Sequence, residues 1–492
     1  MKVGYSRIAV GDACYLYDTA TNAIVEVSSA VHAVLEDYLR LGSRAVLRKF
    51  AGRLPAEDLG QAVDFLRTCR GYRMLQPMRR LDYLRFADAA NLRKQYAKGL
   101  SVMTLGITEH CNQRCRYCPS WRADRGAPRH GKMSWDTARQ SIHYLLSHAD
   151  QRVAPTVDLY GGEPLLNWPV VRQAILHIRH DLRRPDVEIL LYTNATLLDR
   201  AKSELLMANR VVLQVSLDGP AHVHDKARVL AAGRATGTHA RVLRVLNWIR
   251  RRNPDYYRTC VRLHCTFSLE SDLLEVFRYF SRPIFRDVRI SFGYRTGDLR
   301  VSKADRVRHE AQLDELVDQH LRALRERRPF HRALFASIMH GTFGPLEGRT
   351  VGQPGKEPQP NSACVPGHPM VFVSGDGTLY PCCKYNPAGS GIGDCRSGID
   401  TDKAQGLLQT HARLCNRMCQ GCWAWRLCSH CFLHSVDADG RPSQTRKEKA
   451  CQAEKQRIVR ALRRYVYIWR NEPAWASEVK DTLRYSVGHE DV

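Results

Sequence analysis

The chain has 492 residues, 44% of them hydrophobic, which is enough for about three domains, and 75 lysine and arginine residues against 50 aspartate and glutamate residues leave a formal charge of +25. No apolar run approaches the roughly 18 residues that span a bilayer, and the first residues lack the apolar stretch of a signal peptide, so we expect a cytoplasmic protein without a membrane partner. The 17 cysteines then predict metal ligation rather than a disulfide scaffold, because cytosolic thiols stay reduced.

Residues 1–85 are expected to form a small domain of their own. Two apolar runs, at residues 13–17 and 23–27, flank a turn-forming segment and predict a β-hairpin. Ser28 and Ser29 can cap a helix that follows the hairpin, and further helical stretches come after it. The order resembles the winged-helix-like recognition domains of peptide maturases, which bind the leader of a precursor peptide as an added strand. A plain structural cap is the alternative.

Three cysteines with the spacing C-x3-C-x2-C follow the next apolar strand. Cys111, Cys115 and Cys118 suit one iron–sulfur cluster, and three thiolates leave one iron open to an exogenous ligand. Zinc, with His110 as a fourth ligand, is the alternative for this spacing taken alone. The segment resembles the cluster-binding loop of the radical S-adenosylmethionine (radical SAM) enzymes, which usually place an aromatic residue, here Tyr117, just before the third cysteine.

That resemblance implies the cofactors and the chemistry. In the radical SAM family the open iron is chelated by the amino and carboxylate groups of S-adenosylmethionine, which is cleaved to a 5'-deoxyadenosyl radical after one electron arrives. The radical then takes a hydrogen atom from an unactivated C–H bond. We therefore expect S-adenosyl-L-methionine and a 4Fe-4S cluster as cofactors, and an electron donor such as a flavodoxin or a ferredoxin as a partner.

Residues 100–300 alternate short apolar strands with helical stretches. After the strand before the cysteines, strands are expected at residues 156–160, 188–192, 211–215, 261–265 and 288–292. This alternation predicts an α/β fold with a parallel sheet. In the radical SAM family the sheet curls into a partial (β/α)6 barrel that is similar to a TIM barrel, with substrate and cofactor at the carboxyl ends of its strands.

Several residues at those strand ends are carried over as contacts to S-adenosylmethionine. The run that matches the GGEP motif of the family, which contacts the methionyl amino group, consists of Gly161, Gly162, Glu163 and Pro164. By the same resemblance, Asn194 and Ser216 occupy positions that contact the ribose and the methionyl carboxylate. Arg228 is expected to be a carboxylate partner, with an exposed ion pair as the alternative.

Residues 301–360 are expected to form a helix and then a linker, at residues 341–360, that is rich in glycine and proline. A cysteine-rich segment is expected over residues 361–455, and a basic helical tail over residues 456–492. The cysteine-rich segment resembles the SPASM domain, which binds two auxiliary 4Fe-4S clusters in enzymes that modify peptides and proteins. The cysteines that carry this resemblance are Cys364, Cys382, Cys419, Cys422, Cys428, Cys431 and Cys451.

The resemblance also divides these cysteines between the two auxiliary clusters, which makes three 4Fe-4S clusters in the whole chain. The outer cluster is assigned to Cys419, Cys422, Cys428 and Cys451, and the inner cluster to Cys364, Cys382 and Cys431. Between Cys428 and Cys431 the chain is one residue shorter than the family pattern. A fourth ligand of the inner cluster stays open between a substrate atom and Cys383, Cys395 or Cys415. A zinc ribbon on Cys419, Cys422, Cys428 and Cys431 is the alternative to the outer cluster.

Together these resemblances predict a maturase of ribosomally made peptides. Such an enzyme removes a hydrogen atom from a precursor peptide that carries a leader, and installs a thioether or carbon–carbon cross-link while an auxiliary cluster accepts the electron released. The nearest alternative is a sulfatase-maturing protein oxidase, which forms formylglycine. Enzymes of that type usually place an aspartate after the second SPASM cysteine as the proton acceptor, where this chain has Cys383 as a candidate catalytic residue.

Two further alternatives come from other classes of protein. The basic charge suggests a radical SAM enzyme that modifies nucleic acid, but the arginines are spread over the chain without interleaved aromatic residues, so a nucleic-acid partner is not expected. An iron–sulfur protein that only binds or transfers electrons is opposed by the GGEP run. Binding of an acidic leader peptide to residues 1–85 would favour the peptide maturase over both.

Overall fold

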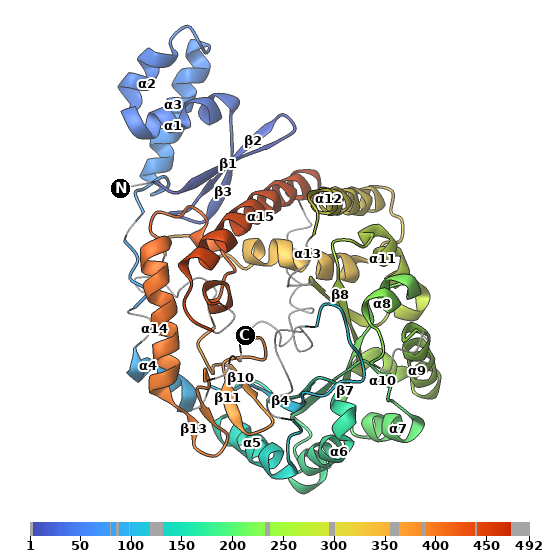
Figure 1. The fold of residues 1–492 in the computed structure, drawn as a ribbon. Coiled ribbons are helices and arrows are strands. Elements are labelled where there is room, and N and C mark those ends of the chain that lie inside the picture. The colour runs from blue at the N-terminus through green and yellow to red at the C-terminus, as the bar shows by residue number, and fades with distance from the viewer. Residues whose placement is uncertain are drawn as a thin grey trace. The chain divides into compact units, whose positions relative to one another are not determined.

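The computed structural model describes residues 3–78, 80–84, 88–97, 99–118, 131–231, 237–294, 301–354, 364–385, 387, 389–437 and 440–473. These residues fall into two compact units. The barrel unit comprises residues 89–338 and 364–406, and the terminal unit comprises residues 3–88, 339–354 and 407–473. Figure 1 labels most of their helices and strands. No helix in the described part of the chain is both long enough and apolar enough to cross a membrane.

A ten-stranded, mostly parallel sheet forms the centre of the barrel unit. Six parallel strands follow one another in chain order: β4 (Val102–Thr108), β5 (Thr156–Gly161), β6 (Glu188–Thr193), β7 (Val212–Ser216), β8 (Val261–Phe267) and β9 (Arg289–Tyr294). Beyond β4 the sheet continues through the parallel strand β10 (Met370–Val373) into the antiparallel strands β11 (Thr378–Tyr380), β12 (Gly393–Asp394) and β13 (Gly398–Ile399). Because β4 lies between β5 and β10, its apolar residues are buried along the whole strand.

Helices connect the parallel strands, since a parallel pair needs a crossover, and they lie on the outer side of the sheet (Figure 1). They are α5 (Trp135–His148), α6 (Trp168–Leu176), α7 (Arg200–Ala208), α8 (Ala221–Ala227), α9 (His239–Arg252), α10 (Pro254–Cys260) and α11 (Leu273–Phe280). The strands have two different faces: in β8, Leu263 and Cys265 are fully buried, whereas His264 and Thr266 are polar and half-buried. This arrangement fits the partial (β/α)6 barrel predicted from the sequence.

The remaining elements of the barrel unit are α4 (Ala89–Ala97), α12 (Lys303–Arg325) and the short helical turns η4 (Pro164–Asn167), η5 (His177–Asp181) and η6 (Pro283–Phe285). The long helix expected between the barrel and the linker is α12, which begins where the Ser302 hydroxyl accepts a hydrogen bond from the backbone N–H of Asp305 at 3.0 Å.

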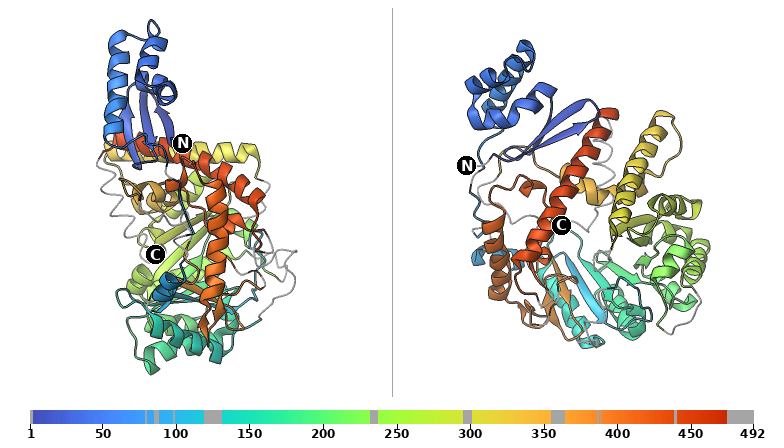
Figure 2. Two further views of the ribbon diagram at one scale, coloured as in Figure 1. Left: turned by 90° about the vertical axis from the view of Figure 1, so that its left-hand side faces the viewer. Right: turned by 45° about the horizontal axis from the view of Figure 1, so that its top comes forward.

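The terminal unit begins with three antiparallel strands and three helices. These elements are β1 (Tyr5–Val10), β2 (Ala13–Asp18), β3 (Ala23–Val27), α1 (Ser29–Leu41), α2 (Ser43–Phe50) and α3 (Ala56–Gly71). Figure 2 shows the helices against one face of the small sheet, where Leu16 of β2 packs with Val31, Val34 and Leu66 of the helices. The hydroxyl of Ser28 accepts a hydrogen bond from the backbone N–H of Val31 at 3.2 Å, which starts α1 at the expected residue.

The sequence did not predict β1. Only Ile8 of this strand is buried, so its residues do not show the alternation of apolar and polar side chains that identifies a strand. The strand forms because β2 offers it a full antiparallel register, from Tyr5 opposite Asp18 to Val10 opposite Ala13. The hairpin that was predicted is therefore part of a three-stranded sheet in the order β1-β2-β3.

Segments from the C-terminal half complete the terminal unit. They include parts of α13 (Arg332–Glu347) and α14 (Thr401–Met418), the turns η7 (Trp425–Leu427) and η8 (Phe432–Ser435), and α15 (Gln444–Asn471). The Thr19 hydroxyl donates a hydrogen bond to the carbonyl oxygen of Trp423 at 2.6 Å, and Arg470 pairs with Asp12 at 2.8 Å. Residues from both ends of the chain thus share one unit.

The structure differs from the expected domain boundaries at two places. The segment 361–455 is divided, since residues 364–406 belong to the barrel unit and residues 407–455 to the terminal unit. The boundary expected between residues 455 and 456 falls inside α15, and the start of the expected linker, near residue 341, falls inside α13. Both helices pack apolar residues such as Phe343 and Leu462, so the glycines and charges that suggested a linker and a tail do not interrupt them.

Candidate functional site

Cys111, Cys115 and Cys118 lie on the loop that directly follows β4. The backbone N–H of Gln113 donates to the sulfur of Cys111 at 3.4 Å, and the Cys115 thiol donates to Oε1 of Gln113 at 3.5 Å. Burial raises the pKa of the Cys111 thiol to about 11 and that of the Cys115 thiol to about 12. Coordination to iron removes such protons, so this half-buried set of three thiols has the chemistry of a cluster site.

Gly161 and Gly162, at the end of β5, allow a close approach to this loop. The N–H of Gly162 donates to the carbonyl oxygen of Thr108 at 2.7 Å, and the N–H of Glu163 donates to that of His110 at 2.8 Å. A Cβ atom on Gly162 would lie 2.3 Å from the His110 oxygen, and one on Gly161, whose φ is 133°, would lie 2.3 Å from the Thr108 oxygen. The two glycines therefore fix the cysteine loop against the sheet.

Glu163 is fully buried and joins the ends of two strands. Its carboxylate accepts hydrogen bonds from the hydroxyl of Thr193 at 2.8 Å, the N–H of Asn194 at 2.8 Å and the N–H of Leu165 at 3.2 Å. Burial raises the pKa of Glu163 to about 7, although these hydrogen bonds lower it. Pro164 follows as the first residue of η4. The Glu163 carboxylate thus holds the GGEP run to the end of β6.

Asn194 links the end of β6 to the cysteine loop. Its side-chain amide donates to Oδ1 of Asn112 at 2.9 Å, and its Nδ2 lies 3.9 Å from the sulfur of Cys111. The Asn112 amide donates in turn to the Thr196 hydroxyl at 2.9 Å. Asn194, predicted to contact S-adenosylmethionine, is therefore placed directly beside the cysteine triad.

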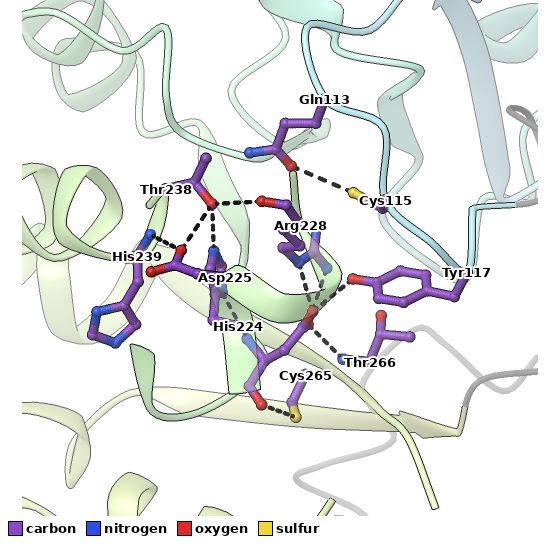
Figure 3. A network of polar contacts seen from close by, with 11 residues as sticks. Gln113, Cys115, Tyr117, His224, Asp225, Arg228, Thr238, His239, Cys265 and Thr266 are labelled. Atoms are coloured by element: carbon purple, nitrogen blue, oxygen red, sulfur yellow. Dashed lines mark hydrogen bonds and ion pairs between the residues drawn. The ribbon is translucent and has the colours of Figure 1, made fainter. Parts of the chain in front are cut away.

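A buried ion pair joins Arg228 to Asp218, at the end of β7 (Figure 3). Nε and Nη2 of Arg228 donate to the two carboxylate oxygens of Asp218 at 2.8 and 3.0 Å. The Tyr117 hydroxyl also donates to Asp218, at 2.7 Å, and the guanidinium lies over the Tyr117 ring, 5.4 Å from its centre. Arg228 is thus paired with a carboxylate of the chain itself, in a buried rather than an exposed pair, and its expected contact with the cofactor stays a prediction.

The segment after α8 holds the cysteine loop from the other side. The backbone N–H of Arg114 donates to the carbonyl oxygen of Val229 at 2.7 Å, and that of Arg116 donates to Ala227 at 3.0 Å. His224 receives a hydrogen bond from the N–H of Asp218 at 3.2 Å and contacts the Thr238 hydroxyl at 3.0 Å, as Figure 3 shows. Burial lowers the pKa of His224 to about 4, so its ring is neutral.

Polar side chains also lie next to one another on three neighbouring strands of the barrel, β7, β8 and β9. Ser216 ends β7, next in register to His264 of β8, which is next to Ser291 of β9. The Ser291 hydroxyl contacts Nδ1 of His264 at 2.9 Å and accepts a hydrogen bond from the amide of Gln214 at 3.1 Å. Ser216, predicted to contact the cofactor, therefore lies at a polar strand end.

Cys383 is half-buried beside Tyr160 of β5. Burial, together with the charge of Cys382, raises the pKa of the Cys383 thiol to about 12. The Tyr160 side chain is hydrogen-bonded to Cys383, and the Tyr160 ring lies 5.2 Å from that of Tyr192, edge to face. A thiol with this pKa stays protonated near neutral pH, so in this state it does not act as a base.

A second thiol-lined site lies in the terminal unit. Cys419, Cys422, Cys428 and Cys451 line a pocket of about 250 Å³, together with residues such as Trp425. The N–H of Cys422 donates to the carbonyl oxygen of Cys419 at 3.1 Å, which forms the tight turn after α14. These are the four cysteines predicted for the outer auxiliary cluster, and the pocket includes Cys451 rather than the Cys431 of a zinc ribbon.

The cysteines predicted for the inner cluster belong to different units. Cys364 and Cys382 are in the barrel unit, and Cys431 is in the terminal unit, 3.9 Å from Nδ1 of His434. This ligand set stays a prediction. Among the described residues, no three histidine, cysteine, aspartate or glutamate side chains are already arranged around one metal ion.

Sequence reasoning missed Asp218, which receives hydrogen bonds from Tyr117, Arg228 and the N–H of Thr266. A signal was present, because Asp218 follows a buried strand within the run Ser216-Leu217-Asp218-Gly219-Pro220. The resemblance to the radical SAM family predicted roles for Ser216 and Arg228, on either side of it. An aspartate at a strand end can serve several purposes, and only its hydrogen-bond partners show which one it serves.

Residues 105–280 match the family model of the Radical SAM superfamily. The chain therefore carries a radical SAM domain, with the cysteine triad and the GGEP run inside the matched region. Such a domain implies S-adenosylmethionine and one 4Fe-4S cluster as cofactors, as the sequence predicted.

Relatives with known names agree with this assignment. The chain is 24% identical over 191 residues to a cysteine-type anaerobic sulfatase-maturating enzyme of Clostridium perfringens, and this match covers 38% of the chain and 50% of that protein. It is 24% identical over 135 residues to the radical SAM cyclopropyl synthase TigE of Paramaledivibacter caminithermalis, which covers 25% of the chain and 28% of that protein. The chain thus spans about half the length of the sulfatase-maturating relative, and less of TigE.

The solved structure of native anSMEcpe with bound AdoMet has the same fold. Its TM-score is 0.56 at 19% sequence identity, and the likeness covers 76% of this chain and 100% of that chain. The predicted α/β fold with a partial barrel is confirmed.

Proposed function

We propose that this chain is a radical SAM oxidoreductase that modifies a precursor peptide and installs an oxidative cross-link, a thioether or a carbon–carbon bond. The observation that carries the proposal is the pair of thiol sites: a triad on the loop after β4 and a pocket lined by four further cysteines. One site suits the generation of a radical, and the other suits an electron acceptor.

The residues of the first site have distinct tasks in this proposal. When bound beside these residues, the cluster and S-adenosylmethionine would supply the radical chemistry that acts on an unactivated C–H bond. Asn194 and Ser216 orient the cofactor, and the Asp218–Arg228 pair with Tyr117 keeps the cysteine loop in a fixed position. Gly161 and Gly162 keep the same loop against the sheet.

A peptide substrate is supported by two further observations. The order β1-β2-β3-α1-α2-α3 in the terminal unit is consistent with the proposed winged-helix-like recognition domain, and β3 is an edge strand to which a leader could add. The anSMEcpe protein, whose fold this chain shares, has also been solved with a bound Cp18Cys peptide. We also propose a flavodoxin or a ferredoxin as the electron donor.

The second candidate is a sulfatase-maturing oxidase, favoured by the sequence relative that carries this name. Cys383 opposes it, because a thiol with a pKa of about 12 is a poor substitute for an aspartate base. A Cys383→Asp variant that gained formylglycine formation on a cysteine-containing peptide would favour this candidate.

The first experiment measures iron, zinc and 5'-deoxyadenosine on the anaerobically reconstituted full chain. We expect about twelve irons per chain, falling to about eight in Cys111→Ala/Cys115→Ala/Cys118→Ala. Dithionite and S-adenosylmethionine should yield 5'-deoxyadenosine with the wild type alone. About four irons with one zinc would contradict the auxiliary clusters, and binding to RNA that falls steeply with salt would favour a nucleic-acid substrate.

A further inference from the structure

Lys447 is a fully buried lysine beside the pocket of the terminal unit. It lies on α15, one turn before Cys451 and two turns before Glu454, so the three side chains share a face of the helix. Its ammonium nitrogen has no oxygen or nitrogen acceptor among the residues that the structure describes. An ammonium buried without such an acceptor is costly, so the site calls for an anionic group that accepts hydrogen bonds.

The groups that face Lys447 are sulfur atoms. The thiols of Cys415, Cys419, Cys451 and Cys428 interact electrostatically with its ammonium. Three of these four cysteines line the pocket, whereas Cys415 does not. The Cys415 side chain is hydrogen-bonded to both Cys419 and Lys447.

The carboxylate that shares this helix face has a partner of its own. Glu454 lies two turns after Lys447, and Arg457 holds both its carboxylate oxygens, at 2.7 and 2.8 Å. Glu454 is therefore paired with Arg457 rather than with Lys447.

The donor set of the pocket fits the auxiliary cluster of the proposed function. Four thiolates around a cubane leave a net negative charge, and the sulfides and thiolates accept hydrogen bonds. The ammonium of Lys447, which has no oxygen or nitrogen acceptor among the described residues, would find anionic acceptors there.

We propose that Lys447 is a positioning residue whose buried charge raises the reduction potential of the cluster held by Cys419, Cys422, Cys428 and Cys451, and so fits this cluster to accept an electron from the substrate. The inference rests on the proposed function, which supplies the cluster. One added electron makes the cluster more negative, and a cation in a poorly screened site favours that state.

The electron balance is simple. The substrate has lost a hydrogen atom to the 5'-deoxyadenosyl radical, and closing the new bond releases one proton and one electron. The proton goes to water, and the electron reduces the auxiliary cluster by one unit of charge. Lys447 neither gains nor loses a proton in this step, because its role is that of a fixed charge.

The test is a redox titration, followed by electron paramagnetic resonance, of the full chain in the background Cys111→Ala/Cys115→Ala/Cys118→Ala/Cys364→Ala/Cys382→Ala, which keeps the pocket cysteines. In this background we expect Lys447→Met to reduce the equilibrium constant for one-electron reduction about tenfold, a fall in midpoint of about 59 mV. Lys455→Met is the matched control. This lysine also lines the pocket on α15 but is only half-buried, so solvent screens its charge and the midpoint should move by less than a third as much.

Lys447→Arg keeps the charge and should keep the wild-type midpoint. Equal midpoints in Lys447→Met and the parent, or equal shifts in Lys447→Met and Lys455→Met, would overturn the inference. If the Lys447→Met variant does not bind iron, the same titration is done on Lys447→Gln. Loss of iron from both Lys447→Met and Lys447→Gln, with iron retained by Lys447→Arg, would also overturn the inference. That result would show that the charge of Lys447 is needed to hold the cluster in place. A parent without iron at the pocket would instead overturn the auxiliary cluster itself, so the two failures are distinguishable.

Discussion

Asp218 shows how one buried carboxylate can organise a loop. Burial alone raises its pKa, but the charge of Arg228 and its hydrogen bonds outweigh burial, so the pKa of Asp218 lies below its ordinary value. Tyr117, from the cysteine loop, and the N–H of Thr266, from β8, donate to the same carboxylate. The charge of Asp218 therefore ties the cysteine loop to two barrel strands.

The first prediction concerns this residue. Asp218→Asn leaves the guanidinium of Arg228 buried without a counter-charge, so we expect a loss of about 3–5 kcal/mol in the free energy of unfolding. Urea denaturation of the protein without cofactors measures it. Asp186→Asn, which removes a largely exposed pair with Arg184, is the matched control and should cost at most about 1 kcal/mol. Equal losses in the two variants would show that burial of the Asp218 pair does not matter.

A second prediction at the residue scale uses the pKa of about 7 at Glu163, raised by burial. The folded state binds this proton more tightly than the unfolded state, whose pKa is near 4.5. The stabilisation from Glu163 is therefore complete below about pH 4.5 and is lost as the pH rises through 7, by about 3 kcal/mol in total. Unfolding measured between pH 5 and 8 should show this slope in the wild type and a flatter slope in Glu163→Gln. A slope unchanged by the substitution would contradict the assignment.

At the scale of elements, the end of β5 lies so close to the cysteine loop that one added side-chain atom would separate them. Gly162→Ala places a Cβ atom against the carbonyl oxygen of His110, which is backbone and cannot move without shifting the loop. We expect the variant to lose about four irons per chain on reconstitution, because the triad is displaced. Iron analysis under anaerobic conditions measures this.

Gly60→Ala is the control for that substitution. Gly60 lies in α3 with no atom near an added Cβ, so the variant should bind iron as the wild type does and should be more stable by about 1 kcal/mol. If Gly162→Ala also kept its full iron content, the glycine would be needed for the ligand alone and not for the loop.

The sequence predicts the elements of the barrel well because its parallel strands are short segments rich in apolar residues, separated by helical stretches. Residues 156–160 and 188–192 are strands within one residue of the expected bounds, as β5 and β6. β1 escaped prediction because a single buried residue leaves no periodic pattern, and α15 extends through the expected boundary because charged residues on one face do not end a helix. Local pattern therefore identifies elements that bury much apolar surface, and it misses those that depend on a neighbouring strand.

Prediction of the candidate site shows the same limit. The residues taken from motifs, such as Cys111, Gly162 and Asn194, lie together at the carboxyl ends of β4, β5 and β6. Asp218 and Lys447 belong to no motif, and their importance comes from burial among particular partners, which spacing along the chain does not reveal.

At the scale of the whole molecule, the cysteines predicted for auxiliary clusters fall into both units, and this makes the two clusters separable. Cys422→Ser removes a thiol from the pocket of the terminal unit, so we expect a loss of about four irons per chain. Cys431→Ser should leave the irons of that pocket in place, because Cys431 does not line it. Mössbauer spectroscopy of the two variants measures this. Retention of all iron in Cys422→Ser, or loss of zinc from either variant, would contradict the assignment.

The pairing of β10 with β4 constrains how the protein is made. Residue 102 pairs with residue 370, so the strand that leads into the first cysteine loop has only one neighbour until three-quarters of the chain has left the ribosome. Such distant pairing is slow to form and exposes a strand edge meanwhile. Iron delivered during synthesis would therefore meet an unfinished sheet, and stable loading of the triad should await translation of the cysteine-rich segment.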